Sequence, residues 1–331
     1  MIIGTGDFRY EVVETWAKWP EGWDVNDICG LRQNSKGVFY IFNRGEHPIV
    51  MLGNDGNFLG SWGEGEFGCP HGISIAHDDS VWLTDIKLHT VRKFTPDGEL
   101  LMELGKKGQA SDSGCTEFLH FWDVRRGAAP FNEPTQAVEA PWGDIYVTDG
   151  YGNARVHVFS PDGKLKLSWG EPGSGAGQFN LPHDIAVDEE GTVFVTDREN
   201  SRIQLFTRDG KFIEQWTRSG RPTGLAMDKK GNFFIPELGA HMAVEGWPYP
   251  LLSPTSHVRI RNHKGDTLAI LGEAPDQFHC CAPGYFYAAH ACCVDADDNL
   301  YIGEPIATVL GHGLRDLPLN CHALQKFARI G

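Results

Sequence analysis

The sequence lacks the features that mark membrane-spanning and nucleic-acid-binding proteins. It contains no apolar run of roughly 18 residues, the length that a membrane-spanning helix needs. Residues 1–10 lack the apolar core of a secretion signal, which predicts a cytoplasmic location. Basic residues are few: 29 Lys and Arg stand against 44 Asp and Glu, for a formal net charge of −15. Because polyanions bind basic surfaces, we expect neither nucleic acid nor a membrane as a partner.

The cysteines lack the Cys-x-x-Cys spacing of a structural zinc site. Two vicinal pairs stand out, Cys280-Cys281 and Cys292-Cys293. Since reduced cysteine packs like a small apolar residue, we expect buried thiols, and a thiolate metal ligand beside His290 is the alternative. The eight cysteines are Cys29, Cys69, Cys115, Cys280, Cys281, Cys292, Cys293 and Cys321.

Short apolar runs separated by turns make up most of the chain, which has 40 glycines and 10 tryptophans. Residues 71–105 and 183–216 each read as four strands, with an Asp-Gly turn before the fourth. Four related copies begin near Gly30, Thr135, Thr223 and His290. Six four-stranded repeats predict an all-β, six-bladed propeller that forms a single domain over residues 1–331. The last copy lacks a fourth strand, and we expect residues 10–16 to supply it and close the fold.

Three histidines occupy matching positions in the second, fourth and sixth repeats. His71 lies in Cys-Pro-His-Gly, His183 in Leu-Pro-His-Asp, and His290 in Ala-Ala-His-Ala. Each directly precedes the first strand of its repeat, which in a propeller faces the central channel. Three neutral imidazoles with an open fourth position are typical of catalytic zinc, so we predict a metal held by these three residues. Cobalt, manganese or iron would also fit such a site.

Two arginines and a tyrosine follow neighbouring strands. Arg44 and Arg198 come directly after short apolar runs, and a guanidinium binds a carboxylate through two parallel hydrogen bonds. Their alternative role is structural pairing with Glu46 or Glu199. Tyr151 lies between two glycines, and a nearby dication would favour its phenolate as a base. Together these residues predict a catalytic site for an anionic substrate.

The combined motifs resemble peptidyl-α-hydroxyglycine α-amidating lyases over nearly the whole chain, from about Gly30 to Gly303. The matching segments include Pro-His-Gly, Asp-Gly-Tyr-Gly-Asn-Ala-Arg and Asp-Arg-Glu-Asn-Ser-Arg, and lie at 42–47, 70–72, 82–91, 149–155, 182–183, 197–204 and 301–303. The resemblance implies a six-bladed propeller that cleaves an α-hydroxyglycine into an amide and glyoxylate. It implies zinc bound by the three histidines and Tyr151 as the base that deprotonates the α-hydroxyl. It also implies that Arg44 and Arg198 bind the carboxylate of the substrate.

The chain departs from that family at several positions. Ala291 replaces an aspartate that helps to hold a structural calcium ion, which makes calcium doubtful here. Asn132, Gly152, Phe194 and Leu205 stand where the family has the cysteines of two disulfides. These departures add to the expectation of a reducing, cytoplasmic setting.

The sequence therefore predicts a zinc-dependent carbon–nitrogen lyase acting on a small-molecule or short-peptide carboxylate. One alternative is a metal-dependent hydrolase of a small amide or ester, with His89 or His322 as the base. Another is a non-catalytic propeller that binds a protein. Inserts at 105–131, 241–257 and 308–322 are expected to narrow the entrance to the site, with Trp247, Tyr249 and the run 285–287 as aromatic lining.

Overall fold

The computed structural model describes residues 1–239, 255–275, 279–311 and 321–330. It divides into two compact units, Trp62–Arg218 and the combination of Met1–Ser61 with Ser219–Gly331. Nearly all of its regular structure is β-strand, apart from three short helices: η1 (Phe121–Asp123), η2 (Arg198–Asn200) and α1 (Ile306–Gly311). No helix in the described part of the chain is long and apolar enough to cross a membrane.

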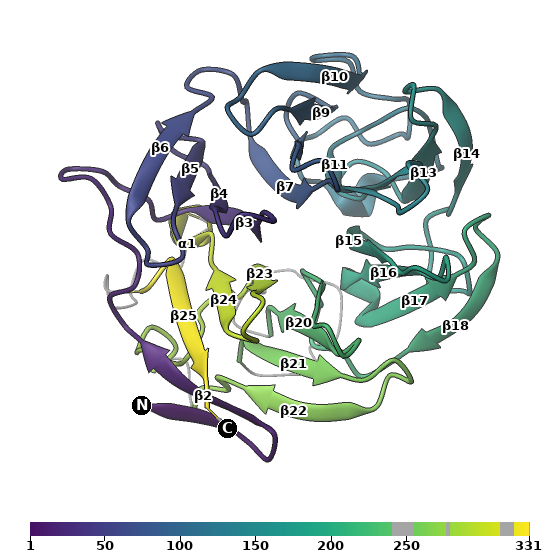
Figure 1. Ribbon diagram of the computed structural model, residues 1–331. Coiled ribbons are helices and arrows are strands. Elements are labelled where there is room, and N and C mark those ends of the chain that lie inside the picture. The colour runs from purple at the N-terminus through teal and green to yellow at the C-terminus, as the bar shows by residue number, and fades with distance from the viewer. Residues whose placement is uncertain (240–254, 276–278, 312–320, 331) are drawn as a thin grey trace. The chain divides into compact units, whose positions relative to one another are not determined.

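The unit Trp62–Arg218 contains three four-stranded antiparallel sheets whose strands follow chain order (Figure 1). The first sheet has strands β7 (Pro70–Ile75), β8 (Val81–Asp85), β9 (Thr90–Phe94) and β10 (Leu100–Gly105). The second has β11 (Pro134–Glu139), β12 (Ile145–Asp149), β13 (Arg155–Phe159) and β14 (Leu165–Trp169). The third has β15 (Pro182–Val187), β16 (Val193–Asp197), β17 (Arg202–Phe206) and β18 (Phe212–Trp216).

The other unit also contains three sheets. One has strands β3 (Ile28–Gln33), β4 (Phe39–Asn43), β5 (Ile49–Leu52) and β6 (Phe58–Trp62), and another has β19 (Ala226–Met227), β20 (Phe233–Glu237), β21 (His257–Arg261) and β22 (Thr267–Leu271). The third has five strands, in the order β1 (Ile2–Thr5), β2 (Phe8–Val13), β25 (Leu324–Arg329), β24 (Leu300–Gly303) and β23 (Ala291–Val294).

The predicted fold class is confirmed: six meandering sheets correspond to the six repeats and form the blades of a six-bladed β-propeller. The N-terminal segment completes the last blade as predicted, because β2 pairs with β25 from Tyr10↔Arg329 to Val13↔Lys326. β1 adds a fifth strand outside it, which the repeat pattern did not predict. The single-domain organisation stays a prediction.

Apolar side chains stabilise the blades within each unit. The second strands β8, β12 and β16 are buried at every residue, as expected for strands covered on both faces. In the unit Trp62–Arg218 one core cluster centres on Trp82, Phe131 and Phe159, and another on Phe179 and Phe206. The outer strand β18 is exposed at four of its five residues. The inner strands are therefore the rigid part on which a site can be built.

A carboxylate at the end of the second strand fixes the loop that leads into the first strand. Asp85 accepts the N–H groups of Gly68 at 2.6 Å and Cys69 at 3.0 Å, just before β7. Asp197 likewise accepts the Asn180 N–H at 2.7 Å, just before β15. Burial raises the pKa of Asp197 to about 6. These buried acids hold the loops that carry His71 and His183, which gives them a structural role.

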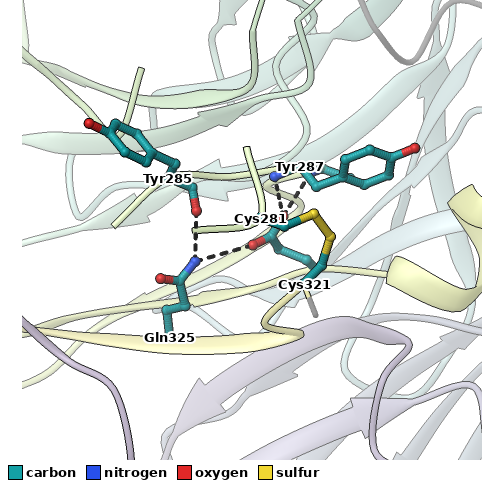
Figure 2. Close-up of a disulfide and its surroundings, with 7 residues drawn as sticks. Cys281, Tyr285, Tyr287, Cys321 and Gln325 are labelled. Atoms are coloured by element: carbon teal, nitrogen blue, oxygen red, sulfur yellow. Dashed lines mark hydrogen bonds between the residues drawn. A yellow bond between two sulfur atoms is a disulfide. The ribbon is translucent and has the colours of Figure 1, made fainter. Parts of the chain in front are cut away.

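The expectation that all cysteines are reduced is wrong for two of them. Cys281 and Cys321 form a disulfide (Figure 2), whereas the other six cysteines form none. Figure 2 also shows Gln325, whose amide donates to the carbonyl oxygen of Tyr285 at 2.8 Å. The disulfide therefore joins the segment that leads to β23 to the segment that leads to β25. The sequence around each cysteine could not indicate this pairing, because the two residues are 40 positions apart.

The three inserts differ in what the structure describes. The insert 105–131 is described throughout and contains η1. The predicted aromatic residues Trp247 and Tyr249 lie outside the described residues, as does most of the insert 308–322. In the run 285–287, Phe286 and Tyr287 are fully buried, and Phe286 packs in a core cluster of its unit with Tyr10 and Phe327. Phe286 is therefore a core residue.

Candidate active site

His71 lies on β7 and is 2 % exposed. Its Nδ1 donates to the carbonyl oxygen of Thr135 on β11 at 2.7 Å. Because a carbonyl only accepts, this bond places the proton on Nδ1 and leaves the lone pair of the neutral ring on Nε2. Gly72 allows the close approach of the two strands, since a Cβ there would lie 2.3 Å from the same carbonyl oxygen. The Pro-His-Gly motif is thus explained by packing against β11.

His183 lies on β15 and is 1 % exposed. Its ring centroid is 4.7 Å from that of His71, with the two planes at 69°. β11 packs beside both β7 and β15, and the Thr135 hydroxyl lies 2.9 Å from the carbonyl oxygen of Pro182. Thr135 therefore holds the main chain beside one histidine and the ring of the other.

Tyr151 connects the two histidines. Its hydroxyl is 3.3 Å from His71 Nε2 and 3.1 Å from His183 Nε2. It follows β12 in a tight turn that requires Gly150, where a Cβ would lie 2.0 Å from the Pro182 carbonyl oxygen. The phenol is 9 % exposed. One oxygen thus lies within hydrogen-bond distance of the Nε2 atoms of two of the three predicted metal ligands.

Arg198 completes this group. Its Nη1 donates to the Tyr151 hydroxyl at 3.1 Å, and its side chain is almost fully buried. Its Nε donates to Glu199 Oε1 at 2.6 Å, so the structural pairing left open by the sequence also exists. The two interactions use different nitrogens of the guanidinium. Glu199 therefore orients Arg198 while Nη1 faces the phenol.

Arg44 and His290 belong to the other unit and have anchors there. His290 is 6 % exposed, and its Nδ1 donates to the carbonyl oxygen of Cys29 at 2.9 Å. Arg44 is half-buried, and its Nη1 donates to Thr308 Oγ1 at 3.2 Å. Thr308 is itself held by Asp27, whose Oδ1 accepts the Thr308 N–H at 2.9 Å. The alternative pairing of Arg44 with Glu46 stays a prediction.

The three buried histidines are a candidate metal-ligand group. His71 and His290 both have Nδ1 bonded to a main-chain carbonyl, the arrangement that usually fixes a metal-binding imidazole with Nε2 toward the ion. Neutral imidazoles suit zinc, copper, iron and nickel better than calcium or magnesium. The donor set therefore fits a transition metal.

Sequence reasoning missed the supporting residues. The Thr135 carbonyl oxygen had no signal, because every residue has one. Glu133 is buried beside the site: its carbonyl oxygen lies 3.5 Å from the Tyr151 nitrogen, and burial raises the pKa of its carboxyl to about 8. Its N–H donates to Nδ1 of His89 at 3.1 Å. Burial also lowers the pKa of His89.

This combination of fold and site defines a propeller built from NHL repeats. The model of the NHL repeat matches residues 179–206, which include His183 and Arg198. Human NHL repeat-containing protein 3 is 32% identical over 247 residues, 70% of this chain and 67% of the relative. The chain belongs to this family of NHL-repeat propellers, which also contains the amidating lyases.

Two further relatives are named as peptide-amidating enzymes. The rat peptidylglycine alpha-amidating monooxygenase is 34% identical over 279 residues, 74% of this chain and 26% of the relative. The Drosophila melanogaster peptidyl-alpha-hydroxyglycine alpha-amidating lyase 1 is 34% identical over 168 residues, 47% of this chain and 28% of the relative. The chain thus spans about a quarter of the length of these relatives, and their activities do not transfer to it by similarity alone.

A solved structure supports the fold. A streptogramin B lyase superposes with a TM-score of 0.60 at 12% identity, covering 96% of this chain and 97% of the other. At that identity the likeness concerns the propeller fold only.

Proposed function

We propose that this protein is a zinc-dependent carbon–nitrogen lyase that cleaves an N-acyl-α-hydroxyglycine into an amide and glyoxylate. The observation that carries the proposal is the Tyr151 hydroxyl, which lies within hydrogen-bond distance of His71 Nε2, His183 Nε2 and Arg198 Nη1. The names of the amidating relatives support the same reaction class. The substrate is a small molecule or short peptide that ends in a carboxylate.

The ligands in this proposal are His71, His183 and His290, each through Nε2. A bound divalent ion would supply electrophilic polarisation of the substrate oxygens. The Nδ1 bonds of His71 and His290 orient these two rings, so little reorganisation would accompany binding.

Tyr151 is the proton carrier in the proposed reaction. In its phenolate form its oxygen accepts the proton of the substrate α-hydroxyl while the C–N bond breaks and the carbonyl of glyoxylate forms. The bonding pair stays on the amide nitrogen, which takes up a proton as it leaves. This proton is the one that Tyr151 accepted, and its transfer to the nitrogen regenerates the phenolate, so protons and electrons balance. The Arg198 N–H directed at the phenol stabilises negative charge on its oxygen.

The two arginines bind the substrate carboxylate in this proposal. Arg198 is preorganised by Glu199, and Arg44 by Thr308. A buried guanidinium retains its charge and presents several N–H donors in a plane, which suits a carboxylate. The overall net charge is −15, so the surface as a whole repels anions. The two arginines would provide a local positive charge that attracts a small anionic substrate.

The hydrolase alternative is weaker because His89, one of its two proposed bases, is engaged; His322 as the base stays a prediction. Nδ1 of His89 accepts the Glu133 N–H, so this nitrogen does not accept a proton from water in the described conformation. The binding-module alternative stays open for the relative NHL repeat-containing protein 3, whose name gives no activity. A protein-binding propeller has no need for Tyr151, His71 and His183 to share one buried contact.

The cytoplasmic location stays a prediction. The Cys281–Cys321 disulfide argues against it, since structural disulfides persist mainly in oxidising compartments.

The deciding experiment combines metal analysis with a glyoxylate-release assay on α-hydroxyhippurate. We expect about one zinc ion per chain and stoichiometric glyoxylate and benzamide. The variant His183→Ala should lose both metal and activity, while His77→Ala, a substitution on an exposed turn of the β7–β8 hairpin, should keep both. Metal without glyoxylate release would favour the hydrolase, and absence of metal after reconstitution would favour the binding module.

A further inference from the structure

The insert 105–131 is hydrogen-bonded to the turn that carries Tyr151. Ser113 is fully buried, and its hydroxyl donates to the carbonyl oxygen of Gly152. Ala128 and Asn153 form a reciprocal pair, in which the Asn153 Nδ2 donates to the Ala128 carbonyl oxygen at 2.8 Å. Two residues directly after Tyr151 are therefore bonded to an insert that breaks the repeat pattern.

Asn132 is the centre of these contacts and is 2 % exposed. Its carbonyl oxygen accepts the Gly152 N–H at 3.0 Å. Its Nδ2 donates to Ser113 Oγ at 3.0 Å and to the carbonyl oxygen of Cys115 at 3.0 Å. Its N–H donates to the Asp149 carboxylate at 2.9 Å. One side chain and its peptide group thus connect the insert, the end of β12 and the turn.

The Asn132 side chain also fills the space that a side chain at position 152 would occupy. A Cβ on Gly152 would lie 2.3 Å from Asn132 Oδ1 and 2.4 Å from its Cγ. Real Cβ atoms do not approach that closely, so with Asn132 in place the turn can take its described position only with glycine at 152. Asn132 and Gly152 are therefore complementary in both shape and hydrogen bonding.

We infer that Ser113, Asn132 and Gly152 form a clamp that positions the Tyr151 phenol for catalysis, which makes the insert 105–131 a support of the active site. The inference rests on the proposed function for its kinetic consequence only. The Tyr151 hydroxyl lies within hydrogen-bond distance of His71, His183 and Arg198, and such contacts depend on where its main chain lies. Displacing a catalytic group by about 1 Å costs up to roughly 100-fold in rate.

The first test measures the turn without relying on activity. Hydrogen exchange should become faster in the peptide that contains residues 151–153 in Ser113→Ala and Asn132→Ala. The matched control is Ser74→Ala, because Ser74 is also buried and its hydroxyl donates to one main-chain carbonyl, that of Ala137. Exchange that rises equally over the whole unit, or not at all, would overturn the clamp.

The second test is kinetic. In Ser113→Ala and Asn132→Ala we expect kcat for glyoxylate release to fall by roughly 10- to 100-fold, with KM and zinc content nearly unchanged. Ser74→Ala should lose similar thermal stability and keep kcat. Equal kcat in the clamp variants and the control would contradict the positioning role. A wild-type protein that releases no glyoxylate would refute the proposed lyase instead, and the exchange experiment would still decide the clamp.

A designed disulfide provides the rescue. In the double variant Asn132→Cys and Gly152→Cys, a disulfide would replace the contact between the Asn132 side chain and position 152, where a Cβ would lie 2.4 Å from the Asn132 Cγ. After oxidation with glutathione disulfide we expect loss of two titratable thiols and recovery of most of the wild-type kcat. Reduction with dithiothreitol should lower kcat of the double variant again. The same treatment should not lower kcat of the wild type, which has no disulfide between positions 132 and 152. A cross-linked variant without recovery would refute the clamp as a positioning device.

Discussion

The Tyr151 hydroxyl and the Arg198 guanidinium are joined by a 3.1 Å hydrogen bond in which the arginine donates. The guanidinium carbon also lies 5.3 Å from the centroid of the phenol ring. Both side chains are buried, so water screens this interaction little. In the proposed reaction the arginine would therefore act on the base as well as on the substrate, and substitutions at the two positions should have related effects.

Replacing Arg198 tests this relationship. Arg198→Ala should lower kcat/KM by roughly 10²- to 10³-fold, because it removes a preorganised donor. Arg198→Lys should recover little, since an ammonium group does not reproduce the bonds to Glu199 and Tyr151 together. Steady-state kinetics on α-hydroxyhippurate measures both, with the exposed Arg208→Ala as the control. Near wild-type activity of Arg198→Ala would remove this residue from the site.

Tyr151→Phe separates proton transfer from metal binding. We expect kcat to fall by roughly 10²- to 10⁴-fold, the usual contribution of a general base. Zinc content should remain that of the wild type, because the phenol is not a proposed ligand. Metal analysis on the same sample distinguishes this result from collapse of the site. A variant that loses zinc as well would show that Tyr151 mainly supports the histidines.

Removing the metal should abolish activity and leave the fold. The blades are held by apolar clusters within each unit and by buried carboxylates such as Asp85. After treatment with a chelator we therefore expect no glyoxylate release and an unchanged far-ultraviolet circular dichroism spectrum. Added zinc should restore activity. Full activity in the chelated protein would exclude the metal from the reaction.

The repeat pattern predicted the fold because each blade buries its strands in the same way. It predicted the place of the N-terminal strand because the last repeat was one strand short, and β2 indeed pairs with β25. The family resemblance indicated His71, Tyr151, His183 and Arg198, which the structure brings together. Local motifs are sufficient for these residues, since each follows or begins an inner strand.

The sequence could not predict what holds these residues. Thr135 acts through its carbonyl oxygen, and Asn132 through contacts with residues up to 21 positions away, so neither has a local signature. The family that this chain resembles has cysteines where Asn132 and Gly152 stand. The resemblance did not indicate that the Asn132 amide fills the space beside position 152. The Cys281–Cys321 disulfide was missed because it depends on the path of residues distant in sequence.

Breaking that disulfide should destabilise the protein. Cross-linking across 40 residues restricts the unfolded chain, and such bonds contribute about 2–4 kcal/mol to the free energy of unfolding. Cys281→Ser and Cys321→Ser should therefore lower Tm by similar amounts, and dithiothreitol should lower Tm of the wild type but not of either variant. Cys69→Ser is the control, because Cys69 forms no disulfide. Insensitivity of the wild type to reduction would show that these two thiols are not paired in solution.

Glu133 should make stability depend on pH in a specific direction. Burial raises the pKa of its carboxyl from 4.5 to about 8, so the folded state binds this proton more tightly than the unfolded state does. Its contribution to stability is therefore complete below the unfolded pKa of 4.5 and is lost as the pH rises through about 8. Glu133→Gln, which stays neutral, should lose less stability than the wild type over that range.

Thermal unfolding between about pH 5 and pH 9 measures this difference, a window that spans the shifted titration. The Tm of Glu133→Gln relative to the wild type should increase toward the alkaline end. Glu189→Gln, at an exposed position, should run parallel to the wild type throughout. Parallel curves for Glu133→Gln as well would mean that the carboxyl is ionised in the folded protein. The Glu133 carboxyl accepts the N–H of Leu119, a residue of the insert 105–131, at 3.1 Å. In that case this N–H would donate to a charged carboxylate.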